Sequence, residues 1–325
     1  MADEARETVP RFKPERTTTT NIRSRKNPQR MQRRFLGNRY VPLRTKIAGL
    51  AGAVALTFFG REKIAGQVFS DNTDTTETPG VTVRINQLPF QDNRIVDLRT
   101  QANNYIFKDL IDKERKEVDK QVREMDQVIL KNPSFKEMVS VVRDYESYIN
   151  QAADKHKIPR SIAYGMVLIE NGGGHDLTSP AGARGPAQLM PDTAREMGLI
   201  VNENIDERVT RPDKAFDAMF SYVAKYRDLF GGDLGIAVWN YHAGPGNVGE
   251  AIRLYFLEEN GVDIGELNFK VYGDLIKQKK LNAAKLLSNA RVKQQLLPRL
   301  EDETELYPAK AASGAYLYPL YKAVR

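Results

Sequence analysis

The sequence contains no cysteine and only three histidines in 325 residues. The absence of cysteine excludes disulfide bridges, thiolate nucleophiles, iron–sulfur clusters and cysteine-ligated zinc. The histidines are scattered and form no HExxH pattern, which disfavours a catalytic zinc ion. We therefore expect neither a metal nor another cofactor.

Strand-forming patterns are also scarce. The longest covers only residues 81–85, whereas apolar residues recur at helical spacing along much of the chain beyond it. Apolar residues make up 41% of the sequence and charged residues 28%, which is typical of a folded protein and not of a disordered one. The sequence thus predicts an all-α fold.

Acidic residues are few at the N-terminal end. Residues 1–46 hold 13 Lys and Arg against 4 Asp and Glu, and the rest of the chain holds 36 against 38. The net charge of +7 therefore belongs to the N-terminal segment alone. A nearly neutral body disfavours nucleic acid as a partner. We interpret residues 1–46 as a basic cytoplasmic tail.

An apolar run of fourteen residues, 47–60, follows the tail. This length is short of the roughly 20 residues that a spanning helix needs. A signal peptide is a weak match too, because no convincing cleavage site follows. Three interpretations stay open: an uncleaved membrane anchor, which we prefer, a cleaved signal, and a buried hairpin in a soluble protein. The first two place the rest of the chain outside the cytoplasm, either anchored in the cell envelope or secreted.

Residues 61–93 are interpreted as a linker, and residues 94–155 as a helical stalk or brace. One long amphipathic helix is predicted over 94–130, and a second one follows Pro133. The apolar residues of the first recur at spacings of three, four and seven: Ile111, Val118, Val122, Met125 and Ile129. We favour a brace packed on the next domain; the alternative is a coiled coil that binds an envelope-assembly partner through 94–130.

The chain becomes apolar on nearly every side between Ile158 and Glu170. Pro159 suits the first turn of a helix. This segment predicts a buried central helix that ends at a carboxylate. Further helices are predicted at 192–197 and 212–230, each followed by glycine.

Glu170 is the first candidate for chemistry. A buried carboxyl is costly when it ionises, and burial raises its pKa. The structural alternative is a glutamate that caps the next loop or pairs with an arginine. Two glycine-rich segments with polar side chains follow, at 179–191 and 239–248. Loops of this composition let a polymer approach the backbone closely.

The ordered spacing of these elements resembles the catalytic domain of the soluble-lytic-transglycosylase family, which is related to goose-type lysozyme. Ser179, Gln188 and Met190 follow Glu170 by nine, eighteen and twenty residues, as in the family's Gly-Ala-x-Gly-x-x-Gln-x-Met-Pro loop. The family's Ala-Tyr-Asn-Ala-Gly-Pro-Gly element corresponds to Asn-Tyr-His-Ala-Gly-Pro-Gly at 240–246, and its Glu-Thr-x-x-Tyr element to residues 303–307.

The sequence also departs from the family pattern. Asn171 replaces a serine, Pro186-Ala187 replaces Leu-Met, and His242 replaces an asparagine. We expect activity to survive these changes, with His242 a hydrogen-bonded loop histidine outside the proton transfer. Residues 253–300 match no element of the family. We interpret them as an insertion that covers one side of the cleft, with a helix over 281–297.

The resemblance implies a lytic transglycosylase domain over residues 156–325. Such an enzyme is a lyase that acts on peptidoglycan glycan strands. It cleaves the β-1,4 bond between N-acetylmuramic acid and N-acetylglucosamine and leaves a 1,6-anhydro end. A hydrolytic muramidase of the same fold and a non-catalytic wall-binding scaffold are the alternatives.

The resemblance further implies that Glu170 serves alone, first as acid and then as base, because the 2-acetamido group of the sugar replaces a second carboxylate. Four aspartates downstream are expected to cap helices or loops: Asp176, Asp192, Asp213 and Asp233. Tyr241 is expected to hydrogen-bond the Glu170 carboxyl. Polar side chains would bind acetamido or peptide groups, and Met190 and Tyr307 would form walls against the sugar faces. The substrate-binding set is Asn171, Ser179, Gln188, Met190, Tyr241, His242 and Tyr307.

Overall fold

The computed structural model describes residues 93–261, 263–265, 269–300 and 304–322. Several expectations lie outside these residues: the tail 1–46, the apolar segment 47–60, nearly all of the linker 61–93 and the strand pattern 81–85. Within the described part of the chain, no helix is long and apolar enough to cross a membrane.

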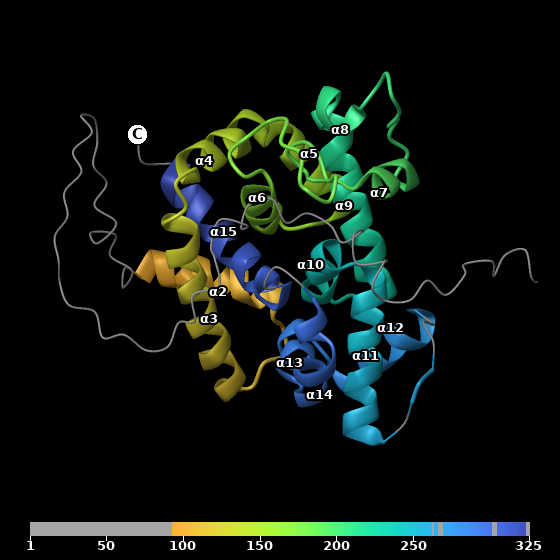
Figure 1. The fold of residues 1–325 in the computed structure, drawn as a ribbon. Helices are drawn as coiled ribbons and strands as arrows, with labels where there is room; N and C mark the ends of the chain where they lie inside the picture. The colour runs from red at the N-terminus through yellow and green to blue at the C-terminus, as the bar shows by residue number, and fades with distance from the viewer. Residues whose placement is uncertain (1–92, 262, 266–268, 301–303, 323–325) are drawn as a thin grey trace, which may run out of the picture. The chain divides into compact units, whose positions relative to one another are not determined.

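Helices form nearly all the regular structure of the described residues, as predicted (Figure 1). Three isolated β-bridges are the other pairings there. The order is α2 (Asn93–Ile106), α3 (Asp112–Leu130), α4 (Phe135–Asp144), α5 (Glu146–His156), α6 (Arg160–Glu170), α7 (Pro191–Glu196), α8 (Glu207–Thr210), α9 (Pro212–Leu229), α10 (Leu234–Ala243), α11 (Pro245–Asn260), α12 (Phe269–Lys279), α13 (Ala283–Ser288), α14 (Ala290–Gln295), the 3₁₀ turns η4 (Leu297–Arg299) and η5 (Thr304–Leu306), and α15 (Tyr307–Lys322).

The single long helix predicted over 94–130 is wrong. The chain leaves α2 at Ile106, passes through Asp109 at φ 57° and re-enters a helix at Asp112. Ile106 and Phe107 are both buried, so burial of this corner outweighs helix continuity. The sequence does not mark this break, because charged residues typical of a helix surface continue on both sides of it. The second predicted helix is also divided, into α4 and α5, at Tyr145.

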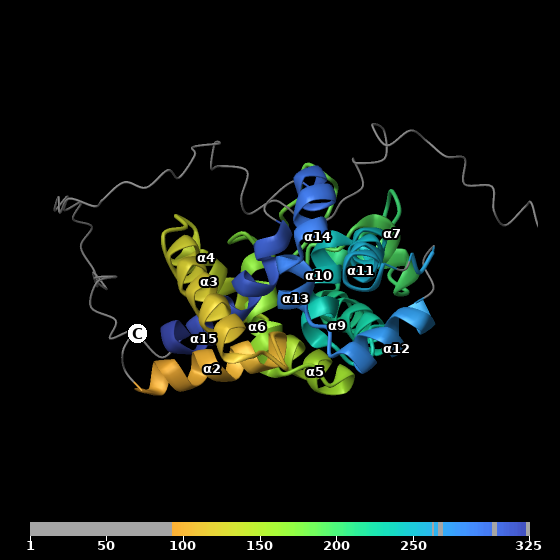
Figure 2. The same cartoon turned by 90° about the horizontal axis from the view of Figure 1, so that it is seen from below.

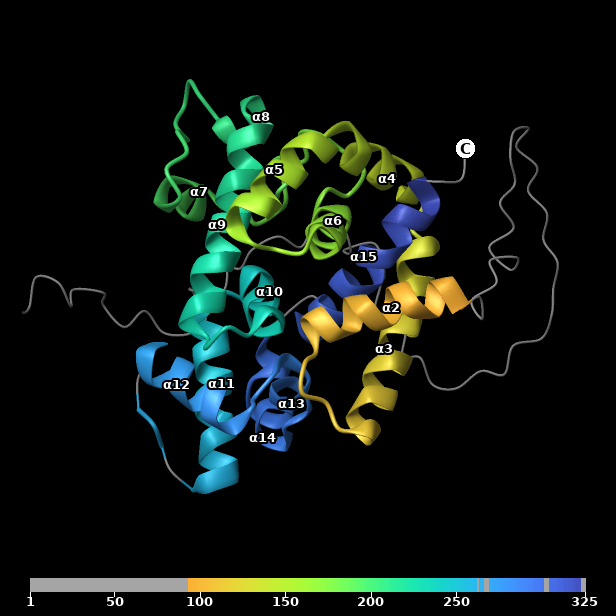
Figure 3. The same ribbon diagram turned by 180° about the vertical axis from the view of Figure 1, so that it is seen from behind.

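Helix α3 is a brace within the fold. Four residues of its apolar stripe, Val118, Val122, Met125 and Ile129, are buried, whereas Ile111 before its first turn is 62% exposed. Helices α2 and α3 both pack against α15 (Figures 2 and 3). The side chains of Asp126 on α3 and Ser313 on α15 join these two helices through a buried hydrogen bond of 2.6 Å. Most of the stripe that favoured a coiled coil is therefore buried within this chain.

The central helix α6 lies against α15, as close as two backbones can come (Figure 1). A Cβ added to Gly165 would lie 2.2 Å from the carbonyl oxygen of Ala311, and one added to Gly314 would lie 3.0 Å from the Cα of Gly165. Only glycine fits such a crossing. This contact fixes the height of α15 relative to the end of α6, where Glu170 lies.

The segment 239–248, expected to be a loop, is mostly helical. Helix α10 is buried throughout and is capped by Asp233, whose Oδ1 accepts a hydrogen bond from the Ile236 amide at 2.7 Å. The chain turns at Gly244 with φ 79°, and α11 starts at Pro245. One glycine and one proline make the junction.

Residues 253–300 form the end of α11 and then α12 to α14, which contact α9, α10 and α11 (Figures 1 and 3). Tyr272, Ile276, Leu286 and Val292 are buried in the common core. The helix predicted over 281–297 is present in two short pieces, α13 and α14.

Candidate active site

Glu170 is the last residue of α6 and is only 3% exposed. Burial raises the pKa of its carboxyl to about 8, and a hydrogen bond from Tyr307 offsets part of that rise. At neutral pH the carboxyl therefore carries its proton. This is the form that a general acid needs.

The hydrogen-bond donor to Glu170 comes from the far end of the chain. Tyr307, the first residue of α15, donates its hydroxyl to Oε1 of Glu170 at 2.6 Å. Tyr307 is itself buried, and burial together with the Glu170 charge raises its pKa well above 10. The phenol thus stays protonated. Tyr307 was expected to form a wall against a sugar face; in the structure its hydroxyl is hydrogen-bonded to the candidate acid.

Tyr241 does not make the hydrogen bond expected of it. Its hydroxyl donates to the carbonyl oxygen of Ala187 at 2.5 Å, and the hydrogen bond to the Glu170 carboxyl comes from Tyr307. Tyr241 is still near the carboxyl, since the Glu170 charge contributes to raising the Tyr241 pKa. Its bond to Ala187 holds the loop before α7 against α10.

Asn171 belongs to the turn that follows α6. Its side chain is wholly buried, and Nδ2 donates to the carbonyl oxygens of Val167 at 2.8 Å and Met138 at 3.2 Å. Its Oδ1 accepts from the Gly173 amide at 2.8 Å. Both amide hydrogens are used inside the protein, so the expected contact of Asn171 with substrate has no donor left.

Ser179 and Gln188 shape the loop between α6 and α7. The Ser179 hydroxyl accepts a hydrogen bond from the Ala183 amide at 2.9 Å. Gln188 sits at φ 47°, and its Nε2 donates to the carbonyl oxygens of Leu177 and Gly185, both at 2.9 Å. Its buried Oε1 has no hydrogen-bond partner among the described residues. Gln188 therefore retains one unpaired acceptor, whereas the Ser179 hydroxyl is bonded within the loop.

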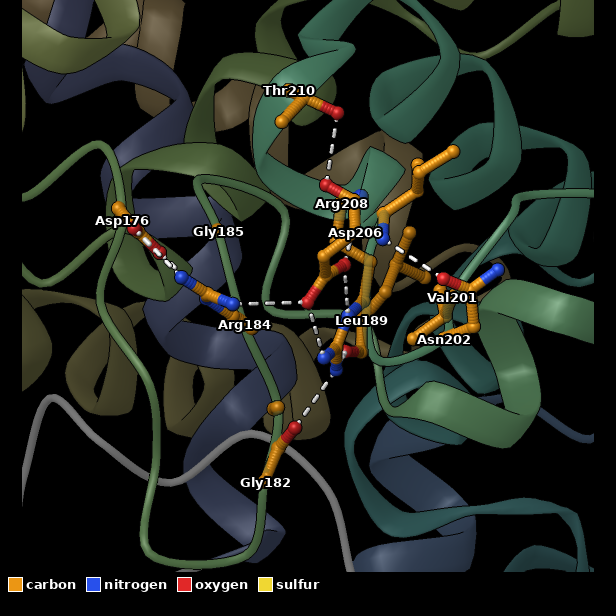
Figure 4. A network of polar contacts seen from close by, with 12 residues as sticks. Asp176, Gly182, Arg184, Gly185, Leu189, Val201, Asn202, Asp206, Arg208 and Thr210 are labelled. Carbon is orange, nitrogen blue, oxygen red and sulfur yellow. Dashed lines mark hydrogen bonds and ion pairs between the residues drawn. The ribbon is translucent and has the colours of Figure 1, made fainter.

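A buried arginine from α8 fastens this loop (Figure 4). Arg208 donates to the carbonyl oxygens of Gly182 at 2.8 Å and Leu189 at 2.9 Å. The same guanidinium holds both carboxylate oxygens of Asp206, at 2.9 and 2.8 Å. The pair of Asp206 with Arg208 was not predicted from the sequence, because many exposed ion pairs share the same Asp-x-Arg spacing.

A second arginine extends the network along the loop (Figure 4). Arg184 binds both carboxylate oxygens of Asp176, at 2.7 and 2.9 Å, and reaches Asp206 at 3.2 Å. Gly185 follows with φ 78°, and a Cβ there would lie 2.2 Å from the Arg208 carbonyl oxygen. The loop is thus held by charge-assisted bonds on one side and by close backbone packing on the other.

A pocket of about 340 Å³ opens beside this loop. Loop residues, the start of α7, Tyr222 of α9 and the junction of α10 with α11 line it: Ala181, Gln188, Leu189, Met190, Pro191, Asp192, Thr193, Tyr222, Tyr241, Gly244 and Pro245. Met190 and Gln188 thus lie on the wall of this pocket. None of the lining residues comes from the described part of 253–300.

His242 is carried by α10 and not by a loop as expected. Its ring stacks on the ring of Tyr307, with centroids 4.6 Å apart and planes 9° from parallel. Burial, with a smaller contribution from the charge of Lys310, lowers its pKa to about 4, so the imidazole is neutral at pH 7. Its Nδ1 has no hydrogen-bond partner in the described part of the chain. The prediction of a loop position for His242 is therefore wrong, because the residue lies within α10.

The four aspartates divide into one cap and three ion pairs. Asp233 caps α10 as predicted. Asp176, Asp192 and Asp213 each bind an arginine, namely Arg184, Arg195 and Arg211. The carboxylate of Asp192 is 99% exposed at the pocket wall. No group of three or more His, Asp or Glu able to hold a metal is found among the described residues.

Residues 147–260 match the family model described as "Transglycosylase SLT domain". These residues are a transglycosylase SLT domain. The resemblance drawn from Glu170 and the two motif segments is thereby confirmed. Tyr307 and the helices α2, α3 and α15 lie outside the matched residues.

Known proteins with related sequences point to the same family. Membrane-bound lytic murein transglycosylase D, from two Escherichia coli strains, is 25% identical over 186 residues, which are 57% of this chain and 41% of the relative. The chain therefore spans less than half the length of these relatives. Among solved structures, an inactive mutant of the lytic transglycosylase Slt from Pseudomonas aeruginosa aligns with 72% of this chain and 34% of its own, at 19% identity and a TM-score of 0.37.

Proposed function

We propose that this chain is a peptidoglycan lytic transglycosylase with Glu170 as its single acid and base. The observation that carries the proposal is the state of Glu170 within the SLT domain: buried, protonated at neutral pH, and held by one phenol. No carboxylate is among the groups that shift its pKa, and the 2-acetamido group of the sugar would take the part of a second carboxylate. The substrate is the β-1,4 bond between N-acetylmuramic acid and N-acetylglucosamine.

In the first step Glu170 gives its proton to the glycosidic oxygen. The bond from that oxygen to C1 of the muramic acid breaks, and its electron pair stays on the leaving sugar. The carbonyl oxygen of the 2-acetamido group bonds to C1 in its place. Retaining two-carboxylate glycosidases use a second carboxylate about 5 to 5.5 Å away as the nucleophile for this task; here the acetamido group of the substrate is the nucleophile.

In the second step the Glu170 carboxylate takes the proton of the C6 hydroxyl. The oxygen of that hydroxyl attacks C1 and displaces the acetamido oxygen, which leaves a 1,6-anhydro ring and restores the protonated acid. No water is consumed. The Tyr307 hydroxyl stabilises the carboxylate between the two steps, because it donates to the oxygen that becomes charged.

The pocket beside the loop is the proposed seat of the glycan. The free Oε1 of Gln188 supports an acceptor role toward an acetamido or peptide N–H. Met190 and Tyr241 supply apolar and aromatic wall against a sugar face. Ser179, Asn171 and the pair of Asp206 with Arg208 hold the loop that presents these groups.

The cell envelope is the proposed location. The relative from Escherichia coli is named a membrane-bound murein enzyme, and residues 47–60 form an apolar segment behind a basic tail. Anchoring through 47–60 keeps the catalytic residues outside the cytoplasm. Protease added to spheroplasts should then remove the catalytic domain; a domain that survives until the cells are lysed contradicts this location.

Product analysis in heavy-oxygen water tests the reaction. The full chain is incubated with purified sacculi, and the released muropeptides are analysed by mass spectrometry. A lytic transglycosylase gives anhydromuropeptides that carry no label. Products heavier by one water, with the label at the reducing end, would identify a hydrolytic muramidase, and binding without release would identify a wall-binding scaffold.

A further inference from the structure

Three helices bring one side chain each into a linear arrangement around the candidate acid. His242 of α10 stacks on Tyr307 of α15, and Tyr307 donates to Glu170 of α6. All three side chains are buried. The order is therefore imidazole, phenol, carboxyl, with a single hydrogen bond between the last two.

The stacking geometry is specific. Ring centroids 4.6 Å apart with planes 9° from parallel fall at the close end of the range for stacked aromatic pairs. A tyrosine has two rotatable side-chain bonds, and a flat partner on its ring face restricts both. A restricted ring keeps its hydroxyl in one place, and here that place is 2.6 Å from Oε1 of Glu170.

Other roles for His242 fit less well. Like Glu170 and Tyr307, it is not among the residues that line the pocket, and unlike Glu170 it is not needed for either proton transfer. The described structure records the ring contact with Tyr307 and an influence of the Lys310 charge, but no hydrogen bond at Nδ1. The contact that remains for the imidazole is its stacking on the phenol ring of Tyr307.

We propose that His242 is a positioning residue that acts through Tyr307: its ring fixes the phenol, so that the phenol hydroxyl stays on the Glu170 carboxyl. This inference rests on the proposed function of Glu170. The groups that face the carboxyl are the phenols of Tyr307 and Tyr241, and the charged group that faces His242 is Lys310.

Single variants of the full chain give the first test, with soluble glycan strands as substrate. His242→Ala removes the ring, His242→Phe keeps a flat ring without nitrogen, and Tyr307→Phe removes the hydroxyl. His242→Ala should lower kcat about two- to tenfold and leave KM unchanged, since one stacked pair is lost. The pH at which activity falls should move upward, as in Tyr307→Phe, because a bond that favours the carboxylate is weakened. His242→Phe should keep most of the activity.

The double variant separates positioning from general damage. If His242 acts through the Tyr307 hydroxyl, His242→Ala adds no further loss of kcat once Tyr307 is Phe. Losses that multiply would overturn the proposal. A raised KM in His242→Ala, which marks a substrate contact, would overturn it as well, and so would a His242→Phe variant as slow as the alanine variant.

A titration without substrate tests the same inference independently of activity. The Glu170 carboxyl carbon is followed by NMR in isotope-labelled full-length protein, and its signal is assigned by its loss in Glu170→Gln. Its pKa, about 8 in the native chain, should rise in His242→Ala and stay in His242→Phe. An unchanged value in a folded alanine variant would overturn the proposal. Failure of the native chain to release glycan fragments would overturn the proposed function and leave this titration valid.

Discussion

The candidate site combines residues from two regions of the chain. One region is the part that matches the SLT domain, and the other consists of the helices outside that match. Glu170, Gln188 and Tyr241 belong to residues 147–260, whereas Tyr307 comes from α15, beyond the matched region. The acid is thus supplied by one region and its hydrogen-bond donor by the other. The residues that match a family model therefore need not include every residue that contacts the candidate acid.

Two glycines of the matched region mark where the other region packs on it. Gly165 of α6 meets the carbonyl oxygen of Ala311, and a Cβ on Gly235 of α10 would lie 1.9 Å from the carbonyl oxygen of Ile106. Neither has a positive φ. Their role is therefore close approach and not turn geometry, and the flanking helices are built into the core.

The largest loss of stability is expected from breaking this contact. Gly165→Ala should destabilise the protein by about 3 kcal/mol or more, at the upper end for overpacking, because its Cβ meets backbone atoms that cannot rotate away. Thermal or urea unfolding measures the change. Gly246→Ala is the matched control, since a Cβ there meets nothing within 4 Å. Equal stability of the two variants would contradict the close crossing of α6 and α15.

The second effect is a pH-dependent gain of stability in Glu170→Gln. The native pKa of about 8 lies above the ordinary value of 4.5, so the folded chain holds a proton that the unfolded chain releases. Native stability therefore falls as the pH rises from 4.5 to 8, by about 1.4 kcal/mol per unit. Glutamine lacks this loss, so urea unfolding should show a growing advantage of the variant across this window. A constant difference would contradict the raised pKa.

A smaller effect is expected where the two regions meet at Tyr307. Tyr307→Phe keeps the ring and its stack on His242 but removes the hydroxyl. We expect about a tenfold loss of kcat, as a hydrogen bond to a charged group contributes roughly 1.5 kcal/mol. The upper limit of the pH–rate profile should also move to higher pH. An unshifted profile would show that the hydroxyl does not act on Glu170.

The smallest effect on activity is expected at another buried carboxyl, Asp126 of α3. Its pKa is also raised by burial, to about 6, but the groups that lower it are Ser313, Tyr316 and two arginines, and Glu170 is not among the groups that shift it. Asp126→Asn should leave kcat within about twofold. A loss comparable to that of Tyr307→Phe would show that the brace tunes the site directly.

Local patterns in the sequence predicted the parts that depend on nearby residues. The nearly unbroken apolar run before Glu170 predicted both the helix and the buried carboxyl, because burial on all sides leaves that signature. The family resemblance, with its spacing from Glu170, pointed to Gln188 and Met190, and both line the pocket. The cap at Asp233 followed from its position before an apolar helix.

Contacts between residues far apart in the sequence could not be predicted from these local patterns. Tyr307 lies 137 residues from Glu170, and nothing near either residue marks their hydrogen bond. The break after Ile106 was missed because the helical pattern continues across it, whereas the burial of Ile106 and its contact with Gly235 depend on residues far away in the sequence. The glycines near His242 suggested a loop, although only Gly244 departs from helical geometry.

Release of anhydromuropeptides by Glu170→Gln tests the central claim most directly. Glutamine is nearly the same size as glutamate but can neither give nor take the proton that both steps need. The matched control is Glu124→Gln, an exposed glutamate of α3. With purified sacculi, the account predicts a folded Glu170→Gln protein that releases no detectable anhydromuropeptide, beside a control as active as the native chain. Release within about tenfold of native by a folded Glu170→Gln protein would contradict the single-acid mechanism.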